Sequence, residues 1–451
     1  MSAIEINKES IDELVELVQS RNQEELDPVL EKLYPADIAE LFDDLELDEA
    51  VYVASLLEPQ KKVDVLTELE PDTKLKFLEG YSNDEIANDF FAYIDSDDAA
   101  DILNSMDTTQ GKEILRTLTD KEHSKNIASL LKFADNVAGG LMAKELIRVK
   151  LNWTVKQCTD EIRQQAEDVN KVYTVYVVDD YDELVGWVSL KAILLAKEKM
   201  TVSEIYNDNI IFEYTYTSGE EVAATIQKYD LVALPIVDAF NRLVGRITFD
   251  DIIDFVKEEA DKDYQMLSGI SGGKDTSDTV MSNTRARLPW LIVGLAGGIA
   301  SSLVIGNFEA ELAKNVQLAL FMPLIMAMAG NVGVQSSSIM VQGLANNTIT
   351  NSDVWGKLGK ELAIAIINGL VCSALLMGYG YVSGNHIDIM MTVSLALLSV
   401  ILMAAVIGTV VPLALDRLKI DPALATGPFI TTSNDLLGLF LYFVIGNLLL
   451  A

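Results

Sequence analysis

Asp435 is the residue whose type and place in this sequence most strongly imply chemistry. It lies in the run TTSNDLLGLFLYF, about 12 residues into the last long apolar segment, which at 1.5 Å per helical residue is roughly 18 Å deep in a bilayer core of about 30 Å. A carboxylate near that midplane must be protonated, paired with a cation or exposed to water. Because no Lys or Arg lies at comparable depth in any apolar segment, a cation from solution is the simplest partner. A protonated or helix-capping aspartate is the alternative.

The second apolar segment carries polar and helix-breaking residues that suit a cation path. Pro323 is followed by GNVGVQ at 330–335, and proline and glycine that interrupt a membrane helix can free backbone carbonyls to face a cavity. Asn331 and Gln335 fall on neighbouring helical turns and can line the same surface. We therefore expect a broken helix here, with Asn331 and Gln335 lining the pore near Asp435.

The last apolar segment opens with DPALATGPF, which we expect at the cytoplasmic mouth of the same path. Asp421 begins this stretch, and Gly427 with Pro428 breaks the helix. Thr431 follows, four residues before Asp435. The sequence thus offers Asp421 as a second metal ligand of the pore, and Gly427 and Thr431 as further lining positions.

Five apolar segments are long enough to cross a bilayer, which takes about 20 residues. They are 288–305, 316–340, 362–382, 391–415 and 423–450. Basic residues mark alternate connections, namely Arg285 and Arg287, then Lys357 and Lys360, then Arg417 and Lys419. By the positive-inside rule these connections face the cytoplasm. We expect a multi-pass plasma-membrane protein with an all-α membrane domain at 285–451, cytoplasmic N-terminal domains and the C-terminus outside.

The negative charge of the chain is concentrated before the first apolar segment. The first 287 residues hold 60 acidic and 29 basic residues, whereas the rest hold 8 and 5. Such an acidic region repels phosphates, so we expect no nucleic-acid partner, and it suits cations. Plain solubility would also explain the charge. Two histidines, His123 and His386, and two cysteines leave little material for a zinc site or a His-based catalytic triad.

Residues 1–134 have the pattern of short stacked helices. Apolar residues recur at helical spacing, and DIAELFDDL at 37–45 resembles DAADILNSM at 98–106, with VDVLTELEP between them. Units of roughly 30 residues favour an α-solenoid. Such a domain acts as a scaffold or a lever.

Residues 135–258 contain a firm internal repeat. The stretch YVVDDYDELVGWVSLKAIL at 176–194 aligns without gaps to PIVDAFNRLVGRITFDDII at 235–253, an offset of 59. The pattern resembles a tandem pair of cystathionine-β-synthase (CBS) domains, which are α+β modules. In that family a Ser/Thr-x-x-Asp motif can bind the ribose of an adenine nucleotide such as ATP, and only the second copy keeps it, as Thr248 and Asp251.

The run from Asp250 to Leu267 is predicted to be one helix that carries seven acids against Lys257 and Lys262. Like charges one helical turn apart repel, so this density is costly for a helix. A solvated surface helix is the alternative. We assign 259–284 to this acidic connecting helix and to a flexible hinge at 268–278.

The whole chain resembles the MgtE family of magnesium channels. The resemblance rests on the order of these parts and on three motifs, namely the RLPWL start of the first apolar segment, GNVGVQ, and DPALATGPF followed by Asn434-Asp435. The resemblance implies a homodimer with a pore between subunits and magnesium at Asp435. It also implies cytosolic acids that bind magnesium and close the pore. By motif position these sensor acids would be Asp95, Asp98, Glu220, Asp230, Asp251, Asp254, Glu259 and Asp263.

The resulting hypothesis is a channel for Mg²⁺ uptake that cytosolic Mg²⁺ closes. One alternative is a proton-coupled divalent-cation transporter in which Asp435 titrates. Another is an intramembrane hydrolase, for which only the serines at 336–338 near Asn331 are candidates, and no His or Lys lies near a span centre. A CBS-containing chloride channel is disfavoured by the short, five-span membrane part.

Overall fold

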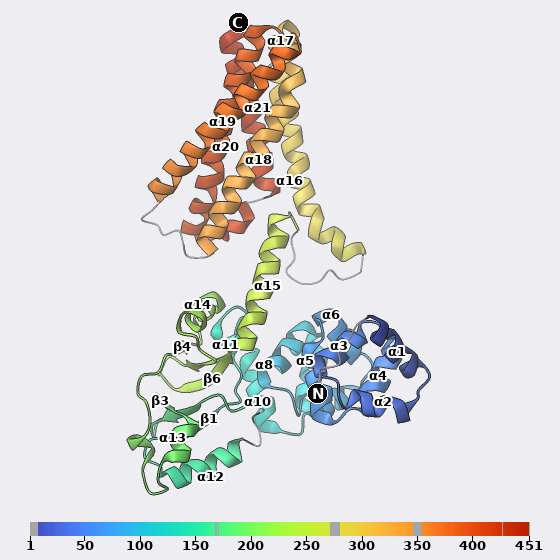
Figure 1. Cartoon of the computed structure of the whole chain (residues 1–451), viewed down its shortest axis with the longest axis vertical. Coiled ribbons are helices and arrows are strands. Elements are labelled where there is room, and N and C mark those ends of the chain that lie inside the picture. Colours follow the sequence, from blue (N-terminus) through green and yellow to red (C-terminus); the bar gives the residue numbers. More distant parts are fainter. Residues whose placement is uncertain are drawn as a thin grey trace. The chain divides into compact units, whose positions relative to one another are not determined.

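The computed structural model describes residues 8–166, 169, 171–270, 280–345, 354–425 and 427–450. The chain forms two compact units, Met1–Lys257 and Glu258–Ala451, and each is described by itself (Figure 1). Most of the predicted hinge at 268–278 lies outside the described residues.

The N-terminal part of the first unit is a stack of short helices. They are α1 (Lys8–Gln19), α2 (Gln23–Leu30), α3 (Pro35–Phe42), α4 (Leu47–Leu56), α5 (Pro59–Glu68), α6 (Pro71–Leu78), α7 (Asn83–Glu85), the π-helical turn η1 (Ile86–Phe90), α8 (Ser96–Ser105), α9 (Thr108–Thr117) and α10 (Lys121–Leu130). Asn83 Nδ2 donates to Glu113 (3.0 Å) and Asn104 Nδ2 to Asp135 (2.9 Å). Side chains 30 and 31 residues apart therefore meet, which confirms the predicted solenoid.

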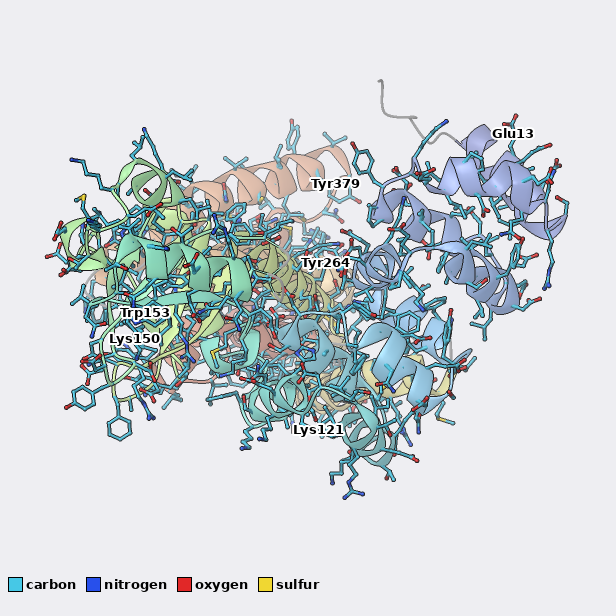
Figure 2. All side chains as sticks on the ribbon, turned by 90° about the horizontal axis from the view of Figure 1, so that it is seen from below. Glu13, Lys121, Lys150, Trp153, Tyr264 and Tyr379 are labelled. Atoms are coloured by element: carbon cyan, nitrogen blue, oxygen red, sulfur yellow. The ribbon has the colours of Figure 1, made fainter. Side chains whose placement is uncertain are left out.

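The sequence starts and ends these helices with ordinary signals. Proline occupies the first position of α3, α5 and α6, where its fixed φ suits a helix and its missing N–H is not needed. Asp107 and Asp120 cap α9 and α10 by accepting backbone N–H groups. Acidic side chains such as Glu13 on α1 point outward, as Figure 2 shows.

The CBS pair consists of two three-stranded sheets with the same order. The strands are β1 (Ile147–Lys150), β2 (Val175–Val178) and β3 (Leu184–Val188), then β4 (Glu213–Tyr214), β5 (Ala233–Val237) and β6 (Leu243–Thr248). In each sheet the first two strands are parallel and the last two antiparallel. The accompanying helices are α11 (Ala138–Leu141), α12 (Val155–Gln165), α13 (Leu190–Leu195), the 3₁₀ turn η2 (Val202–Glu204) and α14 (Gly219–Tyr229).

Equivalent positions of the two copies meet each other. Leu184 N donates to Asn241 O (2.9 Å), and Leu243 N donates to Asp182 O (3.1 Å). Leu184 and Leu243 are equivalent positions 59 residues apart, and so are Asp182 and Asn241. Each hydrogen bond is therefore repeated with the two copies interchanged, which relates the copies by a local two-fold axis. The gapless repeat of the sequence is thus a structural repeat, and the expectation of two equivalent α+β modules is confirmed.

The acidic run forms a single helix, α15 (Phe249–Leu267), as predicted. Its start is fixed by Asp251, whose Oδ2 accepts from Thr248 N (2.9 Å) and from Thr248 Oγ1 (2.5 Å). A carboxylate in the first turn that accepts from the residue before the helix is one half of a capping box. The Thr-x-x-Asp motif therefore has a structural role of its own.

The second unit holds the membrane helices. These are α16 (Val280–Asn307), α18 (Gln317–Ala345), α19 (Val354–Val382), α20 (Ile387–Arg417) and α21 (Pro428–Leu450), with the short α17 (Glu309–Lys314) and the 3₁₀ turn η3 (Pro422–Ala425). Within the described residues, five helices are long and apolar enough to cross a membrane, which confirms the five predicted spans. The most enclosed of them is α20, which packs against α18, α19 and α21, whereas α16 is the most exposed.

The predicted break in the second span is wrong. Pro323 and the glycines of GNVGVQ lie inside α18, which is one continuous helix. A proline removes one backbone hydrogen bond, and neighbouring helices in a bundle can accommodate that loss. The glycines instead let other helices approach closely. The predicted break before the last span is present, because α21 begins at Pro428 after Gly427 with φ of +55°.

Candidate cation pathway and cytosolic acidic site

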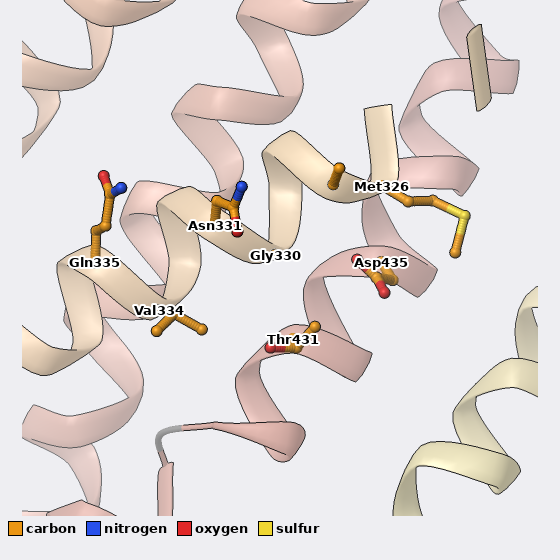
Figure 3. Close-up of a pocket in the computed structure, with 8 residues that line it drawn as sticks. Met326, Gly330, Asn331, Val334, Gln335, Thr431 and Asp435 are labelled. Carbon is orange, nitrogen blue, oxygen red and sulfur yellow. The ribbon is translucent and has the colours of Figure 1, made fainter. Parts of the chain in front are cut away.

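A cavity of about 380 Å³ lies between the middle of α18 and the first half of α21. Figure 3 shows the side chains of both helices around it. It is lined by Met326, Ala327, Gly330, Asn331, Val334 and Gln335 of α18 and by Thr431 and Asp435 of α21. Four of the six predicted pore residues, Asn331, Gln335, Thr431 and Asp435, thus share one cavity.

Gly330 is the residue of α18 that Asp435 faces. A Cβ built on Gly330 would lie 3.4 Å from Asp435 Oδ1 and 3.1 Å from Thr431 Cγ2. Thr431 Oγ1 donates to Gly427 O (3.0 Å), and its oxygen can still accept a hydrogen bond.

The depth of Asp435 differs from the prediction along its own helix. Because α21 begins at Pro428 rather than Ala423, Asp435 is two turns, about 10 Å, into that helix and not 18 Å. It nevertheless faces Gly330, which lies halfway along α18. The placement of Asp435 near the middle of a span therefore follows from its contact with Gly330 of α18, and not from its position along α21.

The cavity suits a hydrated cation. In the part of the chain that the structure describes, no Lys or Arg forms an ion pair with Asp435. Nor do the described residues contain any group of three or more His, Cys, Asp or Glu side chains arranged to hold a metal ion. One carboxylate with amide and hydroxyl neighbours can bind the waters of an ion, whereas a full set of direct ligands is not present in one chain.

Asp421 and Gly427 do not line this cavity. Asp421 is exposed, and its Oδ1 accepts from Ala423 N (2.8 Å) at the start of η3. Gly427 forms the turn into α21, where an added Cβ would lie 2.5 Å from Leu267 O. Their roles in the pore stay predictions.

Three of the predicted sensor acids come together in the first unit. Asp95 and Asp98 lie at the start of α8 and Asp251 at the start of α15. In addition to burial, the charge of Asp251 raises the pKa of both Asp95 and Asp98, and the charge of Asp95 raises the pKa of Asp98. Burial, with the charge of Glu145, raises the pKa of Asp95 to about 6, although Arg246 Nη2 lies 3.8 Å away. Burial raises the pKa of Asp98 to about 7, and Asp251 adds to this effect. The N-terminal and CBS domains thus meet across mutually repelling carboxylates.

The other predicted sensor acids have less specific surroundings. Three of them, Glu220, Asp230 and Asp254, are exposed in the first unit. In the second unit, Lys262 Nζ binds Glu259 Oε1 at 2.5 Å, and Asp263 is half-buried on the same helix. Their roles as metal ligands stay predictions.

Several polar residues of these sites were missed by reading the sequence. Asp97, beside the acidic cluster, is buried, and its Oδ1 has no hydrogen-bond partner among the described residues. Glu145 accepts from Ser96 Oγ (2.8 Å) and lies 3.4 Å from His123 Nδ1. Glu361 is also buried, and the prediction left it out because α19 starts eight residues before the predicted span. A search for every polar residue in and beside the spans would have found it.

The sequence matches known families along most of its length. Residues 33–136 match the MgtE intracellular N domain, 137–199 and 202–258 match CBS domains, and 322–445 match a divalent cation transporter domain of MgtE. The chain is 32% identical over 444 residues to the magnesium transporter MgtE of Thermus thermophilus, covering 97% of this chain and 98% of that one. It is 33% identical over 330 residues to MgtE of Bacillus subtilis, covering 73% of each.

Solved structures agree with the first unit. The cytosolic domain of the Mg²⁺ channel MgtE in complex with ATP matches with a TM-score of 0.51 and 31% identity, covering 54% of this chain and 99% of that one. The soluble part of a magnesium transporter matches with a TM-score of 0.51 and 28% identity, covering 56% of this chain and 99% of that one. These relatives are transporters rather than enzymes.

Proposed function

Because the chain belongs to the MgtE family of magnesium transporters, we propose that it is a magnesium-selective channel that carries Mg²⁺ into the cell across the plasma membrane. The observation that carries this proposal is the cavity in which Asp435, without a basic partner among the described residues, faces the middle of α18. A hydrated divalent cation is the natural partner of such a carboxylate.

The proposed ion site at Asp435 would be completed by a second copy of the chain. Mg²⁺ gives up its waters reluctantly and prefers octahedral oxygen ligands, so two Asp435 carboxylates across a dimer axis would hold the ion through its water shell. The predicted homodimer would supply them. In support, α16 exposes Leu291, Leu295 and Leu303, each about two-thirds exposed, which gives an apolar face to lipid or to a second copy.

Inward movement needs no chemical fuel. With the N-terminal domains in the cytoplasm and the C-terminus outside, a divalent ion entering the cell gains about 4.6 kcal/mol per 100 mV, twice the value for one charge. The protein therefore does not have to couple transport to an energy source, and its tasks are to select the ion and to open and close the pore.

Gating would follow from the acidic cluster. At low cytosolic Mg²⁺, ionised Asp95, Asp98 and Asp251 repel one another, which weakens the packing of α8 against the CBS pair. Bound Mg²⁺ removes that repulsion and favours the docked arrangement, and a ligand shifts an equilibrium only by such a difference in affinity. We propose that the docked arrangement is the closed one.

The second unit offers a route from the connecting helix to the pore helix. An added Cβ on Gly269, just after α15, would lie 2.6 Å from Pro428 Cγ, and one on Gly427 would lie 2.5 Å from Leu267 O. The end of α15 therefore abuts the first residue of α21, two turns before Asp435. A movement of α15 would act directly on the helix that carries the ion ligand.

An adenine nucleotide at Thr248 and Asp251 is a further part of the proposal. It is supported by the bound ATP of the similar cytosolic domain. Because Asp251 already accepts two hydrogen bonds from Thr248, a ribose hydroxyl would compete with the cap of α15. Nucleotide binding would thus act on the start of the connecting helix.

Mg²⁺ flux into liposomes that contain the full chain tests the proposal. The Asp435→Asn protein should lose at least about 100-fold in flux, because the amide keeps the size and removes the charge. The Glu309→Gln protein, which changes an exposed acid of α17 outside the cavity, is the matched control and should keep most of the flux. Flux that follows an imposed pH gradient would favour the proton-coupled alternative, and full flux in Asp435→Asn would reject the proposed site.

A further inference from the structure

Asn434, directly before Asp435 on α21, is fully buried, and neither its Oδ1 nor its Nδ2 has a hydrogen-bond partner among the described residues. An amide in this position loses two or more hydrogen bonds to water without replacement, which is costly inside a membrane protein. Buried polar groups are nearly always paired, so this one requires a physical explanation.

The amide lies where three helices approach one another closely. A Cβ on Gly333 of α18 would lie 1.8 Å from Asn434 Nδ2, and a Cβ on Gly408 of α20 would lie 2.6 Å from Gly333 O. Only glycine at position 333 leaves room for the amide. Asn434 is therefore packed against helix backbones, whose own groups are already paired within the helices.

This junction is directly behind the wall of the cavity. Gly330 and Val334, on either side of Gly333, line the cavity, and so do Thr431 and Asp435, on either side of Asn434. Successive residues of a helix point about 100° apart. A rotation or shift of α21 against α18 that moves Asp435 must therefore move Asn434 relative to the cavity as well.

We propose that Asn434 is a positioning residue of the transport cycle, whose amide gains hydrogen-bond partners, including cavity water, in a second arrangement of α18 and α21. This inference rests on the proposed magnesium transport. The pairing offsets part of the cost of leaving the present arrangement, so the amide keeps both arrangements populated. Asn434 acts through the placement of Asp435 and need not touch the ion.

The test is the Asn434→Leu protein, because leucine has the same branching without polar atoms. Its thermal midpoint in detergent should rise, while its maximal Mg²⁺ flux in liposomes should fall about tenfold at an unchanged half-saturating concentration. Asn434→Val, which is smaller than leucine, carries the same expectation if leucine does not fold. A residue with only a packing role would not give higher stability together with lower maximal flux.

Ser394 on α20 supplies the matched control. Its Oγ is also buried without a partner among the described residues, but it lies where α20 meets Ser373 of α19, away from the cavity. Ser394→Ala should raise the thermal midpoint and leave the flux unchanged. Unchanged maximal flux in both Asn434 variants, or a parallel loss of stability and flux, would overturn the inference. The proposed function would then still stand, since it fails only if the wild type carries no Mg²⁺ or Asp435→Asn keeps its flux.

Discussion

The acidic cluster of the cytosolic unit and Asp435 of the membrane unit use the same chemical group in opposite ways. Asp95, Asp98 and Asp251 crowd together where two domains meet, and burial and neighbouring carboxylates raise their pKa values. Asp435 stands alone among the described acids of its cavity, held by close helix packing at Gly330. Under the proposed function, the crowded carboxylates would make docking depend on cations, whereas the single carboxylate of Asp435 would hold one passing ion.

The largest expected effect concerns the close helix packing beside Asp435 in the membrane unit. Gly333→Ala should destabilise the protein by about 3 kcal/mol, the upper end for overpacking, because its Cβ would lie 1.8 Å from Asn434 Nδ2. Thermal unfolding in detergent measures this. Gly294→Ala on α16, where nothing lies within 4 Å of the added Cβ, is the control and should cost nothing. Equal midpoints for the two variants would show that the close approach of α18 and α21 does not fix the site.

For the acidic cluster of Asp95, Asp98 and Asp251, we expect Mg²⁺ to raise the free energy of unfolding. At 100 times its dissociation constant, Mg²⁺ should stabilise the wild type by about 2.7 kcal/mol. The Asp95→Asn and Asp98→Asn double variant should lose most of this gain and should be more stable than the wild type in EDTA, because repulsion is removed. Glu13→Gln, at an exposed acid of α1, should behave like the wild type. The same Mg²⁺ gain in the double variant would remove the cluster from the gating proposal.

Protonation of the acidic cluster should stabilise the protein, as bound Mg²⁺ should, because both remove the repulsion between carboxylates. The pKa values of Asp95, about 6, and Asp98, about 7, lie above those of the unfolded chain, so their contribution to stability is fully present at low pH and is lost as pH rises through 6 to 7. In EDTA the wild type should lose about 2 kcal/mol between pH 6 and pH 8, mostly through Asp98, at 1.36 kcal/mol per pKa unit. The double variant should show a much flatter profile, and a wild-type stability that rises over this range would contradict the assignment.

The smallest expected effect concerns the approach of Asp435 to α18. Gly330→Ala should reduce Mg²⁺ flux about threefold, or about 0.65 kcal/mol, because the added Cβ would make tight contacts at 3.1 Å with Thr431 Cγ2 and ordinary ones at 3.4 Å with Asp435 Oδ1. Flux in liposomes measures it, with thermal stability measured in parallel. An unchanged flux would show that this wall of the cavity does not narrow the path.

Local signals in the sequence predicted the elements well. The 59-residue repeat predicted two equivalent sheets, and β3 and β6 begin 59 residues apart. Long apolar runs predicted the five spans, and the absence of basic residues near Asp435 singled it out. These properties depend on composition and periodicity over a few turns, so the sequence alone determined them.

Tertiary packing decided what those elements do to one another. Pro323 looked like a break, yet α18 is continuous because neighbouring helices accommodate the lost hydrogen bond. Asp98 and Asp251 are far apart in the chain and meet only when the solenoid packs on the CBS pair. The unpaired amide of Asn434 exists only because Gly333 lets two helices approach so closely. No local pattern encodes such approaches, since they depend on how surfaces distant in sequence fit together.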